Sequence, residues 1–104
     1  MTTFDDREHA FEAKFAHDAE LQFKADARRN RLLGLWAADL LGKDESQAQA
    51  YAKEVVVSDF EESGHEDVVR KLVADLDGKA DEQTIRAKMD ELMTEARRQI
   101  AEEA

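Results

Sequence analysis

Residues 28–42 read Arg28-Arg-Asn-Arg-Leu-Leu-Gly-Leu-Trp-Ala-Ala-Asp-Leu-Leu-Gly42. This segment holds the only Trp of the chain, its densest apolar run and its tightest basic cluster. The leucines and Trp36 recur at steps of three and four residues, so two adjoining faces of one helix are apolar. A helix with so wide an apolar arc needs more than one partner. We expect Trp36, at the middle of this arc, to be the central anchor of the core.

Two glycines in this segment carry structural information. Gly34 lies inside the expected helix, where Gly costs about 1 kcal/mol relative to Ala. Its presence predicts either a close crossing with another helix or a site where a missing side chain is needed. Gly42 is expected to end the helix in the left-handed conformation that helix C-termini favour.

Composition limits the class of protein. The chain has 104 residues, 42% of them hydrophobic, which suffices for a single domain with one core. It lacks Pro and Cys and is poor in Gly, a composition typical of helical proteins. The absence of Cys excludes disulfides, thiolate metal sites and a Cys nucleophile. The chain begins without a leader-like segment and has no uncharged run of roughly 20 residues, so we expect a cytoplasmic protein that does not insert into a membrane.

The charge of the chain is acidic and uneven. Its formal net charge of -10 argues against sequence-independent binding to nucleic acid, because phosphate neutralisation needs a basic face. Residues 1–42 carry 8 acidic and 6 basic side chains, whereas residues 43–104 carry 17 acidic and 9 basic ones. An acidic partner would therefore meet the first half of the chain.

The rest of the chain predicts three further helices. Asp44-x-x-Gln47 is a capping signal that starts the second helix, whose apolar stripe continues to about Glu62. Ser63-x-x-Glu66 starts the third, and Asp81 caps the fourth. Turns are expected at Gly42, Gly64 and Gly78. The inward-facing residues we expect in these helices are Ala48, Tyr51, Ala52, Val55, Val56, Phe60, Val68, Val69, Leu72, Val73, Leu76, Ile85, Met89, Leu92, Ala96 and Ile100.

The first helix is longer than its expected partners. A cap at Thr3 precedes it, and an unbroken helix from Asp5 to Leu41 would measure about 55 Å at roughly 1.5 Å per residue. The fourth helix would cover only about 35 Å of it. An aromatic stripe runs along the first helix and consists of Phe4, Phe11, Phe15 and Phe23. We therefore predict an all-α four-helix bundle with a long first helix, in which residues 1–16 form a mobile N-terminal arm and residues 17–104 form the bundle.

The order of motifs resembles a known family. The run from Phe4 to Lys24, FDDREHAFEAKFAHDAELQFK, is followed by ARRNRLLGLWAA at 27–38, and Tyr51-Ala-Lys-Glu-Val-Val56 and Ile85-Arg-x-Lys-Met89 come later in the same order. This pattern is similar to that of the zeta-type inhibitor of the F-type ATP synthase found in alphaproteobacteria. The resemblance implies a four-helix protein whose N-terminal segment becomes helical on entering a catalytic interface of the ATPase head and blocks ATP hydrolysis.

The resemblance also implies partners and a location. The partner would be the catalytic head of the ATP synthase, with its alpha, beta and gamma subunits, and the protein would be peripheral to the inner membrane through that enzyme. Free protein would be a monomer. The apolar anchors of the arm would be Phe4, Phe11 and Phe15. Its charged residues would set orientation, and they are Asp5, Asp6, Arg7, Glu8, Glu12 and Lys14. The alternative for the three Phe rings is that they complete the bundle core.

A basic cluster follows the arm and consists of Lys24, Arg28, Arg29 and Arg31. These residues are expected to form a solvated face or to pair with the acidic second half of the chain. The alternative is that they bind a nucleotide phosphate or another anion. Because no Gly-rich phosphate loop is present, binding of ATP or ADP would be weak and without hydrolysis. No other cofactor is expected.

Catalytic and metal motifs are not evident. His9, His17 and His65 lack the spacing of a zinc site, and no nucleophile stands with a recognisable His and acid. We therefore expect no metal and no enzymatic activity. Three hypotheses remain, which are a protein inhibitor of the ATP synthase, a small nucleotide- or anion-binding module, and a generic helical adaptor. We favour the first.

Overall fold

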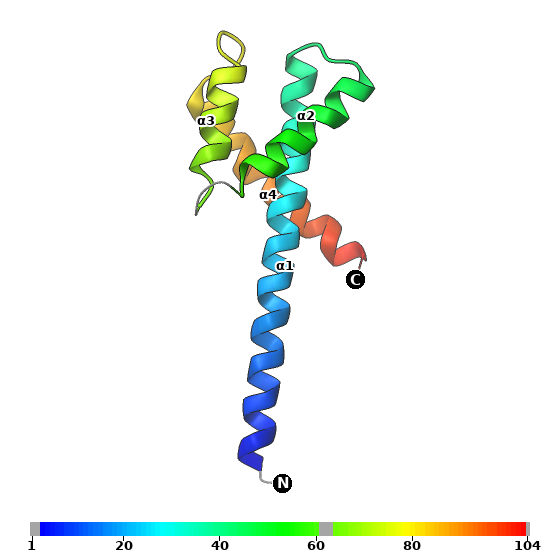
Figure 1. Ribbon diagram of the computed structural model, residues 1–104, viewed down its shortest axis with the longest axis vertical. Helices are drawn as coiled ribbons and strands as arrows, with labels where there is room; N and C mark the ends of the chain where they lie inside the picture. Colours follow the sequence, from blue (N-terminus) through cyan, green and yellow to red (C-terminus); the bar gives the residue numbers. More distant parts are fainter. Residues whose placement is uncertain (1–2, 61–63, 104) are drawn as a thin grey trace.

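The computed structural model describes residues 3–60 and 64–103, with side chains from residue 18 onward. Its four helices are α1 (Thr3–Leu40), α2 (Glu45–Ser58), α3 (Glu66–Asp75) and α4 (Glu82–Glu103). The prediction of an all-α four-helix protein with a long first helix is therefore confirmed. The molecule measures 63 × 26 × 21 Å, because the N-terminal half of α1 extends alone from the other helices (Figure 1).

The helix ends follow the local signals of the sequence. The Asp44 side chain accepts a hydrogen bond from the backbone N–H of Gln47 at 2.8 Å, and Gln47 Oε1 accepts one from Asp44 N at 3.1 Å, which completes the predicted capping box. Asp81 caps α4 by accepting from Thr84 N at 2.8 Å. All three predicted turn glycines have φ between 71° and 86°, a conformation that favours Gly. The predicted cap at Ser63 lies outside the described residues, and His65 stands at the N-terminal end of α3.

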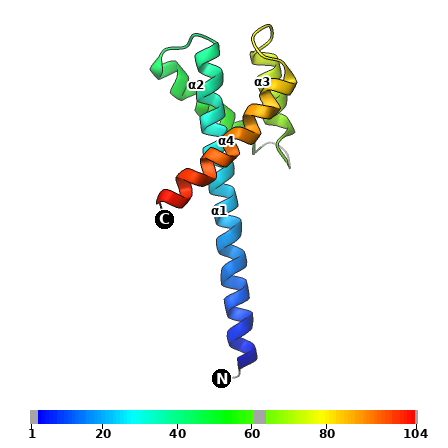
Figure 2. The ribbon, with the colours of Figure 1, turned by 180° about the vertical axis from the view of Figure 1, so that it is seen from behind.

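The crossing between α1 and α2 explains the glycine inside α1. A Cβ atom built on Gly34 would lie 2.6 Å from the Cα of Ala52, which is too close for any side chain. The two backbones therefore meet where neither residue carries a large group, and the predicted close helix crossing is confirmed. The second contact of α1 is with α4, which crosses it at an angle instead of running along its length (Figures 1 and 2).

The core lies where α2 and α4 pack on the C-terminal half of α1 and α3 packs on α2 and α4. Leu33, and not Trp36, is the central residue contributed by α1, because Leu33 is fully buried while Trp36 is only half-buried at the edge of the core. The ring of Trp36 lies 5.7 Å beneath the ammonium group of Lys88. The expectation for Trp36 is thus corrected. The buried cluster consists of Leu33, Ala37, Ala38, Tyr51, Val55, Val68, Val69, Leu72, Leu76, Ile85 and Met89.

Some residues of the predicted stripes face solvent. Phe23 and Phe60 are 59% and 62% exposed, and Val73 is also exposed. Phe60 lies outside the helical stripe because α2 ends at Ser58, four residues before the predicted end. Along α4 the predicted stripe is right, with Leu92 half-buried and four residues buried, namely Ile85, Met89, Ala96 and Ile100.

Candidate functional site

The predicted partner-binding residues lie on the N-terminal part of α1. Helix α1 includes this segment from Thr3 onward, and it projects away from the other helices in both views (Figures 1 and 2). The side chains involved lie outside the described ones, and their proposed roles stay predictions. They are Phe4, Asp5, Asp6, Arg7, Glu8, Phe11, Glu12, Lys14 and Phe15.

Two members of the basic cluster meet the C-terminal end of α4. Arg28 Nη1 lies 2.7 Å from Glu103 Oε1 and donates to Gln99 Oε1 at 2.8 Å. Lys24 Nζ lies 4.0 Å from the other oxygen of Glu103. The hydrogen bond between Arg28 and Glu103 raises the pKa of the guanidinium and lowers that of the carboxyl group. These contacts tie α1 to α4, so Arg28 is already engaged by the acidic second half of the chain.

Arg29 lies on another side of α1 and is 5% exposed. Its Nε donates to Asn30 Oδ1 at 2.8 Å, and its Nη2 lies 4.0 Å from Asp59 Oδ2. Burial lowers the pKa of this guanidinium, whereas the negative charges of nearby aspartates oppose that shift. Arg31 is exposed and reaches Gln49 Oε1 at 3.4 Å. The structure therefore brings Lys24 and Arg28 together and separates them from Arg29.

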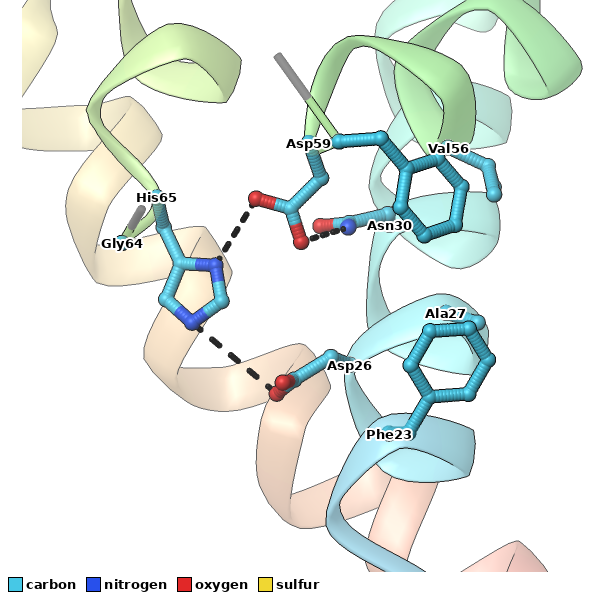
Figure 3. Close-up of a pocket in the computed structure, with 9 residues that line it drawn as sticks. Phe23, Asp26, Ala27, Asn30, Val56, Asp59, Gly64 and His65 are labelled. Atoms are coloured by element: carbon cyan, nitrogen blue, oxygen red, sulfur yellow. Dashed lines mark hydrogen bonds and ion pairs between the residues drawn. The ribbon is translucent and has the colours of Figure 1, made fainter. Parts of the chain in front are cut away.

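A polar junction joins α1, the end of α2 and the start of α3. Asn30 is 1% exposed and donates from Nδ2 to Asp59 Oδ2 at 2.8 Å. His65 lies between two carboxylates, with Nδ1 2.9 Å from Asp59 Oδ1 and Nε2 4.0 Å from Asp26 Oδ1 (Figure 3). A protonated Nδ1 donates to Asp59, whereas an unprotonated Nδ1 accepts from Arg29 Nη2, which lies 3.0 Å away. The junction fixes α3 against α1 and α2.

A cavity of about 200 Å³ opens beside this junction (Figure 3). The two exposed aromatic rings, Phe23 of α1 and Phe60 beyond α2, stand at its side with their centroids 5.8 Å apart. The remaining lining residues are Asp26, Ala27, Asn30, Val56, Asp59, Gly64 and His65.

Sequence reasoning missed the cavity, because its walls come from residues separated by up to 42 positions. One local signal was present. Asn30 stands one turn before Leu33 on the buried face of α1, and a polar residue there needs a buried partner.

Two further features bear on function. None of the described helices is both long enough and apolar enough to cross a membrane. Within residues 18–60 and 64–103, His, Asp and Glu side chains form no group of three or more that could hold a metal ion.

Comparison with known proteins relates the chain to a family and to solved structures. The family model described as ATPase inhibitor subunit zeta matches residues 1–99. A protein whose structure was determined by solution NMR is 57% identical, covers 81% of this chain and 99% of its own, and superposes with a TM-score of 0.75. No curated protein matches the chain.

Proposed function

The chain belongs to the ATPase inhibitor subunit zeta family, and we propose that it blocks ATP hydrolysis by inserting the N-terminal part of α1 into a catalytic interface of the F-type ATPase head. The observation that carries this proposal is the extent of the family match, which begins at residue 1 and therefore includes the projecting segment as well as the bundle. A family of inhibitor subunits acts on an ATPase without being the catalyst itself, and its members associate with the ATP synthase.

The geometry supports an inserted helix. The N-terminal half of α1 projects away from the bundle, so a groove on a partner could surround it (Figure 1). Recognition of a helix in a groove uses apolar side chains at steps of three, four or seven residues. Phe4, Phe11 and Phe15 have this spacing, and the charged residues between them would fix the direction of insertion. We propose the catalytic subunits and the gamma subunit of the head as the surfaces that this helix contacts.

The bundle would contribute to inhibition indirectly. Linking the arm to a folded domain that docks outside the catalytic interface converts insertion into an intramolecular step. Such linkage raises the local concentration of the arm without any new contact at the active site. We therefore propose that residues 17–104 provide docking and that residues 1–16 provide the block, with the whole protein peripheral to the membrane that carries the synthase.

The test is ATP hydrolysis by the cognate purified ATPase head. Wild-type protein should inhibit, deletion of residues 1–16 should abolish inhibition, and the truncated protein should keep some binding to the head. Phe11→Ala combined with Phe15→Ala should weaken inhibition without changing the melting temperature. Full inhibition by the truncated protein would show that the inhibitory surface lies outside residues 1–16. A large loss of melting temperature in the double variant would assign these rings to the core.

The alternative of a nucleotide- or anion-binding module has less support. Lys24 and Arg28 already contact Glu103, and Arg29 lies on another side of α1. Weak binding of ATP or ADP stays a prediction. Titration of the free protein with ATP while backbone amide shifts are followed would test it, since a phosphate site should produce the largest shifts at residues 24–31.

A further inference from the structure

The cavity beside the polar junction presents an aromatic surface that the described residues leave exposed. Phe23 and Phe60 are more than half exposed and stand against each other at its edge. Exposed aromatic pairs at a hollow are common where a partner side chain binds, because the rings give a large contact area at low entropy cost. The floor is preorganised, since Asn30 is buried and held by Asp59.

The charge around the cavity favours a cation. Among the described residues, Asp26 has no Lys or Arg nitrogen within 4.0 Å, and its polar contacts are the amide of Gln22 at 2.9 Å and His65 Nε2 at 4.0 Å. Two carboxylates, those of Asp26 and Asp59, line the cavity, and no Lys or Arg is among its described lining residues. The guanidinium of Arg29 lies 4.0 Å from Asp59 Oδ2 and so partly balances one of these two negative charges. An incoming cation would relieve this imbalance, whereas a phosphate or another anion would be repelled.

We propose that this cavity binds an arginine side chain of a protein partner, its guanidinium pairing with Asp26 and stacking on the rings of Phe23 and Phe60. Arginine suits both parts of the site, because its planar group pairs with a carboxylate in a two-pronged geometry and stacks on aromatic faces. The proposal rests on the proposed function in taking the ATPase head as the partner. Phe23 follows the arm by seven residues, about 10 Å along α1, so the arginine would lie near the mouth of the interface that the arm enters.

The test measures the dissociation constant between the full-length protein and the purified ATPase head. Asp26→Asn and Phe60→Ala should each weaken binding by at least about tenfold, as expected for an arginine contact from which water is excluded. Matched controls are Asp39→Asn, which removes the same charge from an exposed position of α1, and Val57→Ala, which removes an exposed apolar group from α2. Both controls should bind as the wild type does, and thermal unfolding of each variant verifies that the bundle is intact.

A double variant tests whether one partner side chain touches both groups. If a single arginine contacts Asp26 and Phe60, the loss in the double variant should be smaller than the product of the two single losses. If the two losses of affinity multiply in the double variant, the two residues act independently and the proposal is overturned. Wild-type affinity in both single variants, with inhibition by the wild type intact, would overturn the arginine site and leave the proposed function standing. If the wild-type protein does not bind the head, both the arginine site and the proposed function are ruled out.

Discussion

Gly34 shows how one residue sets the distance between two helices. Ala favours a helix by about 1 kcal/mol over Gly, so Gly34→Ala would stabilise an isolated α1. In the protein its Cβ would lie 2.6 Å from the backbone of Ala52, and the helices would have to separate. We expect the cost of this overpacking to exceed the gain in helix propensity, so that Gly34→Ala lowers the free energy of unfolding by about 1–2 kcal/mol. Urea unfolding measures the change. Asp39→Ala, on the exposed face of α1, should not destabilise, and an unchanged midpoint for Gly34→Ala would contradict the close crossing.

Tyr51 is a second residue whose environment has a measurable consequence. Its ring is buried, and its hydroxyl donates to Asp75 Oδ2 at 2.7 Å. The pKa of Tyr51 is raised above its ordinary value, mainly by burial and to a smaller extent by the hydrogen bond to Asp75 and the negative charge of that residue. Hydrogen bonds from Tyr51 and Lys71 in turn lower the pKa of Asp75, although burial alone would raise it. The neutral tyrosine and the ionised aspartate are thus the forms that the fold prefers.

We therefore predict that stability falls at alkaline pH through Tyr51. A tyrosine in the unfolded chain ionises at about pH 10, and Tyr51 in the folded protein ionises at a higher pH. The stability that neutral Tyr51 adds to the fold is therefore complete below about pH 10 and is lost as the pH rises through the folded pKa. Because Tyr51 is the only Tyr, the ultraviolet absorbance of tyrosinate reports it directly. Tyr51→Phe should remove this part of the pH dependence, and native-state ionisation at the ordinary pKa would refute the prediction.

The junction between α1, α2 and α3 depends on Asn30. Its side chain donates to Asp59 and accepts from Arg29 Nε, both at 2.8 Å. Asn30→Ala would leave a partly buried carboxylate oxygen and a buried guanidinium N–H without these partners. We expect a loss of about 1–3 kcal/mol in the free energy of unfolding. Gln49→Ala is the control, because Gln49 makes only an exposed contact of 3.4 Å with Arg31. Equal unfolding midpoints for the two variants would show that the junction adds no stability.

The elements also show what the sequence could predict. Helix starts at Asp44 and Asp81 and turns at the glycines were predictable, because caps and left-handed turns are set by neighbouring residues. The exposures of Trp36 and Phe23 were not, since they depend on where other helices cross α1. The contact between Asn30 and Asp59 joins residues 29 positions apart, and only the packed helices bring them together. Local patterns therefore predicted the elements but not the cavity.

At the scale of the whole molecule, the main feature is a helix longer than the bundle that supports it. The N-terminal half of α1 gives the molecule its 63 Å length (Figure 1). Most of the stability of a protein helix comes from packing of its apolar face, and an isolated helix shorter than about 12–15 residues is marginal in water. The described part of this segment, residues 3–16 of α1, has that length. Their helix is therefore expected to open far more readily than the C-terminal half of α1.

The last prediction is that this segment exchanges its amide hydrogens rapidly in the free protein and slowly in the complex with the ATPase head. Fixing the backbone costs roughly 1–2 kcal/mol per residue, whereas burying one Phe returns only about 1.5–3 kcal/mol. Phe4, Phe11 and Phe15 alone cannot offset the ordering of 16 residues, so contacts with the head and docking by the bundle must supply the rest. Residues 30–40, which contact α2 and α4, serve as the internal reference and should be protected in both states. Equal protection along all of α1 in the free protein would show that the arm is already a stable helix, and inhibition would then involve docking without coupled folding.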